Sequence, residues 1–337
     1  MSAKEYSTLL QNGPVATEQT TRRYRRQPAE MALAVLQAKV LICDPISAVA
    51  VARLRDSGLQ VDERVGLSAE ALEALIGGYD AIVVRSATRL TAKQIAAANR
   101  LRLIVRGGIG TDNIDLDAAA KRHIPVFNTP KASTASVAEL ALGQLLALAR
   151  RTPQADAALK AGKWPKREFS DGVELKDKTL GIIGVGRIGG TLGRYALALG
   201  MRIIGTDTNT MPAGSFDGLE LVPLAALLAR ADCISVHTPS LDGQPVIGRQ
   251  EIAQMKDGAL LINCARGGLI DEAALLEALE SGKLRGAALD VFSEEPPQEQ
   301  RLIHHPQVIC TPHLGGATRE AQARIGMEVV RILLDEL

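Results

Sequence analysis

Three ionisable side chains in the second half of the sequence come shortly after short apolar stretches. They are Arg266, Glu295 and His313, and Glu294 lies beside Glu295 in the same predicted loop. A planar guanidinium can hold a substrate carboxylate with two hydrogen bonds. A histidine titrates near neutral pH and can act as an acid or a base, and a carboxylate beside it favours its charged form and fixes its tautomer. These residue types suit acid–base chemistry on a small carboxylic acid.

Each of these residues also has a simpler explanation. Arg266 suits a surface ion pair, Glu295 a solvated loop, and His313 a capping or core histidine. Their position favours catalysis, because the carboxyl ends of parallel strands meet at one edge of a sheet, where α/β proteins bind ligands. The sequence has no His or Cys cluster with metal-ligand spacing, so we predict no metal site.

The stretch Thr179–Gly190 is an apolar strand that runs into a glycine turn and opens a helix. Gly184, Gly186 and Gly189 have the G-x-G-x-x-G spacing, which lets a backbone turn tightly and approach a pyrophosphate at a helix N-terminus. Asp207 closes the next predicted strand, 18 positions after Gly189, where a carboxylate meets the ribose hydroxyls of NAD and repels the extra phosphate of NADP. The alternative is a glycine-rich turn in an ordinary α/β protein. The context favours an NAD site.

Short apolar strands alternate with helices along both halves of the sequence. From Lys39 the predicted strands are Val40–Cys43, Leu59–Val61, Ala81–Val84, Leu103–Val105 and Pro125–Phe127. From Thr179 they are Leu180–Ile183, Met201–Thr206, Cys233–Val236, Ala259–Ile262, Gly286–Leu289 and Val308–Cys310. The predicted helices are Ser47–Arg55, Ser68–Ile76, Thr91–Ala98, Thr134–Arg150, Ile188–Leu199, Leu224–Ala229, Arg249–Met255, Glu272–Leu279 and Ala317–Leu337. This alternation predicts an α/β protein with two parallel sheets, in two lobes with a ligand cleft between them.

The predicted helix Thr134–Arg150 is rich in Ala and Leu and carries few charges. A helix that is apolar on most sides is buried on most sides, so we expect it to pack between the lobes or against a second subunit. We therefore predict a homodimer through this region.

Composition narrows the class of partner. The 337 residues carry a net charge of +1, which favours neither nucleic acid nor a membrane surface as a partner. Four Phe, four Tyr and one Trp are too few for base-stacking platforms, and the apolar runs predict no membrane span. The four cysteines lie at or near strand ends without C-x-x-C spacing, which is typical of reduced core residues in a cytoplasmic protein: Cys43, Cys233, Cys264 and Cys310.

Residues 1–38 differ from the rest of the sequence. They are polar and rich in Thr and Gln, and four arginines surround Tyr24. We expect a mobile tail with a short helix starting at Pro28. A transit peptide and a nucleic-acid-binding arm are the alternatives, and three glutamates count against the transit peptide.

Four motifs occur together in one order: Gly184-x-Gly186-x-x-Gly189, Asn263-x-Ala-Arg266-Gly-Gly, Asp290-Val-Phe-x-x-Glu295-Pro and Pro312-His313-x-Gly-Gly. On these motifs the sequence resembles the D-isomer-specific 2-hydroxyacid dehydrogenases over residues 39–337. The resemblance implies a Rossmann-type NAD-binding domain inserted in a flavodoxin-like substrate-binding domain. We expect the tail at 1–38, the substrate-binding domain at 39–128 with 317–337, and the NAD-binding domain at 129–316.

The resemblance also implies roles for single residues. Arg266 would orient the 2-hydroxy carboxylate, and His313, hydrogen-bonded to Glu295, would remove the hydroxyl proton as hydride leaves C2 for the nicotinamide. Glu295 is preferred to Glu294 for its place before Pro296. Asp290 would contact the nicotinamide amide, and the loop from His237 the adenosine side. The implied NAD contacts are Gly184, Gly186, Arg187, Ile188, Gly189, Asp207, His237, Thr238, Pro239, Cys264, Ala265, Asp290, His313, Gly315 and Gly316.

The first lobe resembles the 3-phosphoglycerate dehydrogenase branch of the family, which begins serine synthesis. The stretches that carry this likeness are Val84–Thr91, Val105–Asp115 and Ala161–Trp164. Paired guanidinium groups suit a phosphate dianion, so we expect a phosphorylated 2-hydroxy acid to be held by these residues together with Arg266: Arg85, Ser86, Arg106, Gly107 and Gly108. A partner subunit would add Arg150 or Lys166. The alternative for the two first-lobe arginines is structural ion pairing.

Two departures from this branch are visible. Many of its members carry a C-terminal serine-sensing module, and here the sequence stops after the closing helix, so we expect no feedback through such a module. The segment Asn128–Ser133 also differs from the Asn-rich version that is common in the branch, which affects phosphate geometry near Lys131.

Two other functions compete with this one. Another dehydrogenase of the family would act on glyoxylate, hydroxypyruvate or a D-lactate-like acid. A corepressor-like protein would bind NAD as a sensor and contact protein partners, and it would not need His313. The intact set of Arg266, Glu295 and His313 favours an enzyme.

Overall fold

The computed structural model describes residues 38–210, 212–239 and 243–337. The chain divides into two compact units, one of residues up to Ser133 together with Arg319–Leu337, and the other of Thr134–Thr318. The chain therefore leaves the first unit at Ser133, where we expected residue 128, and returns to it at Arg319, where we expected residue 317. The predicted N-terminal tail and its helix at Pro28 lie outside the described residues.

The first unit is built on a five-stranded parallel sheet with the order β2-β1-β3-β4-β5. Its strands are β1 (Lys39–Ile42), β2 (Gln60–Glu63), β3 (Ala81–Val84), β4 (Leu103–Arg106) and β5 (Val126–Asn128). This is the flavodoxin-like strand order, as expected. Because the sheet is covered on both faces, β3 and the last three residues of β1 are buried and apolar, whereas Lys39 at the start of β1 is exposed.

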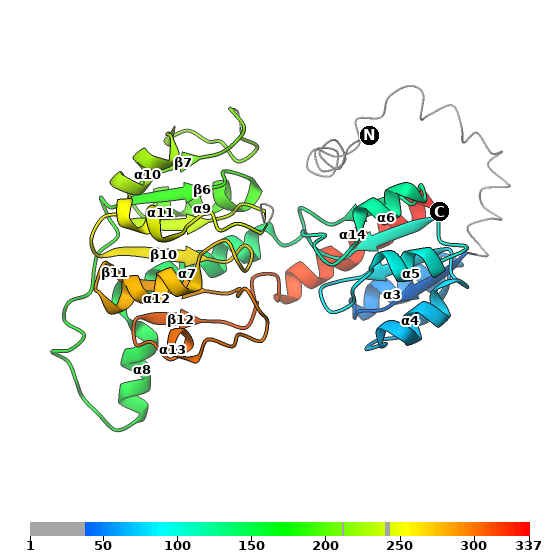
Figure 1. Cartoon of the computed structure of the whole chain (residues 1–337), viewed down its shortest axis with the longest axis horizontal. Helices are drawn as coiled ribbons and strands as arrows, with labels where there is room; N and C mark the ends of the chain where they lie inside the picture. The colour runs from blue at the N-terminus through cyan, green and yellow to red at the C-terminus, as the bar shows by residue number, and fades with distance from the viewer. Residues whose placement is uncertain (1–37, 211, 240–242) are drawn as a thin grey trace. The chain divides into compact units, whose positions relative to one another are not determined.

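Helices cover both faces of this sheet. Helices α3 (Ala48–Asp56) and α14 (Arg319–Glu336) share one core cluster with Val40 and Val83. On the other face, Leu41 and Ile82 pack with α4 (Ala69–Ile76), α5 (Ala92–Ala97) and α6 (Leu116–Lys121). The closing helix α14 thus belongs to this unit although it follows the second one in the sequence, which Figure 1 shows in red beside α3.

The second unit is built on a seven-stranded parallel sheet with the order β12-β11-β10-β9-β6-β7-β8. Its strands are β6 (Thr179–Ile183), β7 (Arg202–Thr206), β8 (Leu219–Leu221), β9 (Cys233–Val236), β10 (Ala259–Asn263), β11 (Leu284–Leu289) and β12 (Val308–Cys310). The strand order reverses beside β6, which pairs with β7 on one side and β9 on the other. This is the Rossmann order extended by one strand, and its ligand position is the carboxyl end of β6.

Two sets of helices cover the two faces of this sheet (Figure 1). Helices α7 (Thr134–Arg150) and α9 (Arg187–Ala198) pack on one face, and α10 (Leu224–Arg230), α11 (Arg249–Gln254) and α12 (Glu272–Glu280) on the other. The remaining helices are α8 (Thr152–Lys160) and α13 (Gln300–Ile303). Helix α7 is buried against α9 and β10 of its own unit, so its apolar composition needs no second subunit to explain it.

The sequence missed four short elements. Strand β8 lies at the edge of its sheet, with side chains that are half-buried or exposed, and so has little apolar pattern. Helix α8 has no buried residue, so its sequence lacks the hydrophobic periodicity that predicts a helix. Helices α6 and α13 have only six and four residues. No helix within the described ranges combines the length and the apolarity that a membrane crossing requires.

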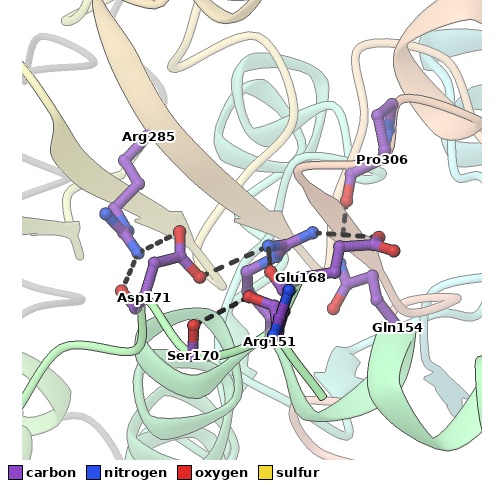
Figure 2. A network of polar contacts seen from close by, with 8 residues as sticks. Arg151, Gln154, Glu168, Ser170, Asp171, Arg285 and Pro306 are labelled. Carbon is purple, nitrogen blue, oxygen red and sulfur yellow. Dashed lines mark hydrogen bonds and ion pairs between the residues drawn. The ribbon is translucent and has the colours of Figure 1, made fainter. Parts of the chain in front are cut away.

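Polar contacts hold α8 and the segment after it against the rest of the second unit (Figure 2). Arg151 donates from Nη1 to the carbonyl of Glu168 at 2.8 Å, and Arg285 pairs with Asp171 at 3.0 Å. Gln154 donates to the carbonyl of Pro306 at 3.0 Å. Arg285 is the second residue of β11 and Pro306 lies two residues before β12, so this network lies at the amino ends of these strands, opposite the loops that follow them.

Candidate active site

The glycine turn after β6 has the backbone geometry that a dinucleotide needs. Gly184 has φ +92°, and a Cβ there would lie 2.8 Å from the backbone of His237. A Cβ on Gly189 would lie 2.3 Å from the carbonyl oxygen of Gly184, so the helix starts close against the strand. In front of Gly186 the space is open, and α9 begins there without a side-chain cap. A helix N-terminus with open N–H groups stabilises a phosphate.

Asp207 is tied to this turn. Its Oδ2 accepts a hydrogen bond from the N–H of Val185 at 2.8 Å, and its Oδ1 accepts from the N–H of Asn209 at 2.9 Å. A carboxylate has about four acceptor positions, so Asp207 can hold the turn and still accept from a ribose hydroxyl. Arg187 and Ile188 follow Gly186 at the start of α9 and are half-buried.

The loop after β9 presents two buried polar atoms beside Gly184. His237 Nδ1 and Thr238 Oγ1 lack a hydrogen-bond partner among the described residues, whereas His237 Nε2 contacts Ser235 Oγ at 2.8 Å. Burial lowers the pKa of His237 to about 4, which keeps the imidazole neutral. Buried polar atoms are normally paired, so two orphans at the edge of the glycine turn fit a site that a polar ligand completes. The residues present therefore fit NAD.

His313 and Glu295 form the one acid–base pair that the predicted residues contain. The distance from His313 Nδ1 to Glu295 Oε2 is 2.8 Å, and both side chains are nearly half exposed. The other oxygen of Glu295 accepts from the N–H of Phe292 at 3.3 Å, which orients the carboxylate. A carboxylate at Nδ1 fixes the tautomer and directs Nε2 outward for proton exchange. Glu295, as expected, is the glutamate that contacts the imidazole.

Asp290 holds the loop that carries His313. It is fully buried, its carboxylate accepts from Thr311 Oγ1 at 2.6 Å and from the N–H groups of Leu314 and Gly315 at 2.7 Å, and its carbonyl accepts from the N–H of His313 at 2.8 Å. The geometry thus gives Asp290 a positioning role. Its contact with the nicotinamide amide stays a prediction.

Arg266 lies in a short turn after β10 that Asn263 closes. The Asn263 side chain accepts from the N–H of Ala265 at 3.0 Å and donates to the carbonyl of Arg266 at 2.8 Å. A Cβ on Gly267 would lie 1.8 Å from the carbonyl oxygen of Phe292, so this turn packs closely against the loop of Glu295. Because β10, β11 and β12 are neighbours and parallel, the loops of Arg266, Glu295 and His313 share one edge of the sheet.

The other predicted cofactor residues lie around these loops. Pro239 is exposed beyond Thr238, Ala265 and Gly316 are half-buried, and Gly315 is buried against Asp290. Cys264 is buried, and its thiol points to Gln144 of α7 at 3.0 Å. Burial, and then the charge of Asp290, raises the pKa of this thiol, so it stays protonated. Three of the four cysteines are buried, and Cys310 is partly exposed.

The predicted phosphate-binding residues lie in the first unit, at the carboxyl ends of the adjacent strands β3 and β4. Arg85 donates from Nε to the carbonyl of Gly107 at 3.3 Å and from Nη1 to that of Pro45 at 3.1 Å. Burial lowers its pKa, and Asp44 opposes that shift. Gly108 has φ +152°, and a Cβ there would lie 1.5 Å from Arg106 Nη1, so the guanidinium of Arg106 lies over this backbone.

Two residues that the sequence did not single out set the loop of Arg85. Asp44 is buried and accepts from the N–H of Arg85 at 2.5 Å and from Thr88 Oγ1 at 2.8 Å. Asn113 donates to the carbonyls of Arg85 at 2.7 Å and Thr88 at 2.5 Å. Ser86 is exposed in the same loop. The position of Asp44 directly after a strand was the available signal.

Comparison with known proteins agrees with this geometry. A family model described as D-isomer specific 2-hydroxyacid dehydrogenase, NAD binding domain, matches residues 142–315. The chain is 46% identical over 308 residues to D-3-phosphoglycerate dehydrogenase of Rattus norvegicus, a match that covers 90% of this chain and 57% of the relative. The chain thus spans little more than half the length of that relative.

Two solved structures extend the likeness to the fold. A glyoxylate reductase from Paecilomyes thermophila has a TM-score of 0.83 and 33% identity, covering 89% of this chain and 96% of its own. D-Lactate dehydrogenase from Aquifex aeolicus, complexed with NAD and lactic acid, has a TM-score of 0.78 and 30% identity, covering 87% and 93%. With the glycine turn, the His–Glu pair and the arginine turn on one Rossmann sheet, these matches show that the chain belongs to the D-isomer-specific 2-hydroxyacid dehydrogenase family.

Proposed function

We propose that the chain oxidises 3-phospho-D-glycerate to 3-phosphohydroxypyruvate with NAD. The observation that carries the proposal is the 2.8 Å contact between His313 and Glu295, at the sheet edge that also bears Arg266 and the glycine turn. The name of the rat relative supports the substrate. Arg85 follows β3 and Arg106 ends the adjacent strand β4, and this placement also supports the substrate, because a phosphate dianion suits two guanidinium groups.

The residues of the second unit would divide the reaction among them. Arg266 would hold the substrate carboxylate with two hydrogen bonds. His313 Nε2 would take the proton of the 2-hydroxyl group while the C2–O bond becomes a carbonyl, and Glu295 would stabilise the imidazolium that forms. Bound NAD would accept the hydride from C2. In reverse, His313 would return the proton to the carbonyl oxygen.

The cofactor would be held by the residues around β6. The N-terminus of α9 and Gly186 would meet the pyrophosphate, and Asp207 the ribose hydroxyls. The two orphan atoms, His237 Nδ1 and Thr238 Oγ1, would gain polar partners on the adenosine side. A carboxylate at Asp207 disfavours the extra phosphate of NADP, so we propose a preference for NAD.

Replacing His313 by Asn tests the acid–base role. We expect turnover to fall about 100-fold or more while NAD still binds, since Asn cannot exchange the proton. Turnover at the wild-type rate in this variant would contradict the proposal and would support a protein that binds NAD as a sensor.

A second candidate is another 2-hydroxyacid dehydrogenase. The two solved structures of similar fold are named for glyoxylate and for lactate, which carry no phosphate. Oxidation of D-glycerate or D-lactate at a rate equal to that of 3-phosphoglycerate would favour this candidate.

We also propose a homodimer. Helix α7, where we expected the interface, leaves Leu146 exposed at 42%, and α8 after it has no buried residue. Leu159 of α8 is 52% exposed and the nearby Trp164 is 80% exposed, which is apolar surface that a second copy would cover. We expect twice the chain mass in solution and a smaller mass for Trp164→Glu. A wild-type protein of monomeric mass would refute the dimer.

A further inference from the structure

A buried amide lies beneath the loops of the candidate active site. Gln144 of α7 is 4% exposed and shares the inward face of that helix with Val137, Ala141 and Leu148. An amide on an apolar face costs free energy unless it is hydrogen-bonded. Its two polar atoms therefore need partners, and both have them.

The partners of Gln144 form one directed chain of hydrogen bonds. Its Nε2 donates to Thr311 Oγ1 at 2.9 Å, and its Oε1 accepts from Cys264 Sγ at 3.0 Å. Thr311 Oγ1 in turn donates to Asp290 Oδ1 at 2.6 Å. The directions are determined, because the Asp290 carboxylate only accepts, so the Thr311 hydroxyl must donate to it and accept from the amide. The protonated thiol of Cys264 then supplies the donor for the amide oxygen.

The two ends of this series of hydrogen bonds belong to the two loops that carry the proposed chemistry. Cys264 is two residues before Arg266, in the turn that Asn263 closes. Thr311 is two residues before His313, and Asp290 holds the other side of that loop through the N–H groups of Leu314 and Gly315. A single side chain from a helix thus connects the substrate-carboxylate turn to the histidine loop.

We propose that Gln144 is a positioning residue, which sets the Arg266 turn and the His313 loop relative to each other through the Cys264–Gln144–Thr311–Asp290 hydrogen bonds. This inference rests on the proposed function, because it assigns Gln144 an effect on turnover through those loops. Gln144 touches neither of the reacting groups itself. It sets the position of Arg266 relative to His313, and turnover depends strongly on that relative position.

Two substitutions distinguish positioning from packing. Gln144→Met keeps the length of the side chain and removes both hydrogen bonds, and we expect kcat to fall about three- to thirtyfold with the KM for NAD within about twofold. Gln144→Glu keeps a donor only while it is protonated. The Thr311 hydroxyl has a single hydrogen, which it donates to Asp290, so it cannot also donate to an ionised glutamate at position 144. The ionised side chain then lies near the Asp290 carboxylate, and only the Cys264 thiol can still donate to it. The ratio of its kcat to the wild-type kcat should therefore fall as pH rises, whereas the ratio for Gln144→Met should stay flat.

Ser136→Ala is the matched control. Ser136 is also a buried polar residue of α7, with a 2.7 Å contact to Thr318 Oγ1 that lies outside the chain of bonds from Gln144. We expect it to lower the unfolding midpoint while kcat and its pH dependence match the wild type. If the Gln144 variants do not fold, the same role is tested by comparing Thr311→Val, which removes the hydroxyl that bonds Gln144 and Asp290, with Thr311→Ser, which keeps it. Only the Ser variant should keep the wild-type kcat.

The outcomes separate this inference from the proposed function. Gln144 variants that lose stability like Ser136→Ala but keep the wild-type kcat at every pH would overturn the positioning role, provided that His313→Asn is inactive in the same assay. Turnover retained in His313→Asn would instead overturn the proposed function. A pH-dependent loss confined to Gln144→Glu, with a flat loss in Gln144→Met, is the result that supports the inference.

Discussion

The contact between His313 and Glu295 gives a prediction whose size follows from the structure. Replacing Glu295 by Gln keeps an acceptor for Nδ1–H and removes the negative charge at 2.8 Å. Unit charges about 4 Å apart attract by about 1 kcal/mol in bulk water and about 4 kcal/mol at an effective dielectric constant of 20. Because both side chains are nearly half exposed, solvent screens the pair, and we take about 1–2 kcal/mol as the lost stabilisation of the imidazolium. That energy corresponds to a fall in kcat of about 5- to 30-fold.

The assay compares Glu295→Gln with Glu294→Gln, an adjacent and exposed position in the same loop. Both variants lose one negative charge, so a general effect of net charge would lower kcat equally in both. We expect kcat of Glu295→Gln alone to fall, with the KM for NAD unchanged, since the glycine turn is untouched. Equal kcat values for the two variants, or a wild-type kcat for Glu295→Gln, would refute the pairing of Glu295 with the proton-transferring histidine.

Three further predictions concern substrate, cofactor and pH. Arg85→Ala should lower kcat/KM about 10- to 100-fold for 3-phosphoglycerate and much less for D-glycerate. The control is Arg89→Ala, which changes an exposed arginine of the same loop. Equal losses of kcat/KM on both acids would indicate that Arg85 has a structural role. Asp207→Ala should weaken the preference for NAD over NADP, and unchanged kinetics with both would remove Asp207 from the site. Because burial lowers the pKa of His237 from 6.5 to about 4, the unfolded state binds the extra proton first, so this residue's contribution to stability is full above pH 6.5 and is lost as pH falls towards 4. Urea unfolding should show the wild type losing about 2 kcal/mol more than His237→Gln between pH 7 and pH 5, and parallel losses in the two proteins would contradict the assignment.

Much of the fold could be predicted because the strands of a doubly wound sheet are buried on both faces. Ala81–Val84 and Cys233–Val236 are buried at every position; the first appears in the sequence as an unbroken apolar run, and the second is interrupted only by Ser235. The glycine turn was equally visible, since its backbone needs a left-handed φ at Gly184 and close approach at Gly189. These constraints are local, so they appear as residue types at fixed spacing.

The elements that were missed lack such constraints. Helix α8 buries no side chain and is fastened by polar contacts such as that of Gln154 with Pro306, which are 152 positions apart. Strand β8 is an edge strand of three residues. Where the sequence pattern is weak, the rest of the unit determines the structure.

The polar contacts that support the site were not predictable from spacing. Asp44 meets Thr88 across 44 positions, and Gln144 meets Thr311 across 167. A polar residue on the inward face of an otherwise apolar helix was the available signal for Gln144. Asp290 was singled out through the family resemblance for a cofactor contact, and the structure adds that its carboxylate holds the loop of His313.

The measurement that tests the central claim most directly is kcat/KM of the purified protein with NAD for 3-phospho-D-glycerate, D-glycerate and D-lactate. Turnover is monitored by the absorbance of the nicotinamide. The proposed function predicts turnover of the phosphorylated acid with a kcat/KM at least about tenfold above that of either other acid, since a paired guanidinium site gains at least one charge-assisted contact from the phosphate. Equal or greater kcat/KM for an unphosphorylated acid would contradict it and assign the chain to another substrate of the same family.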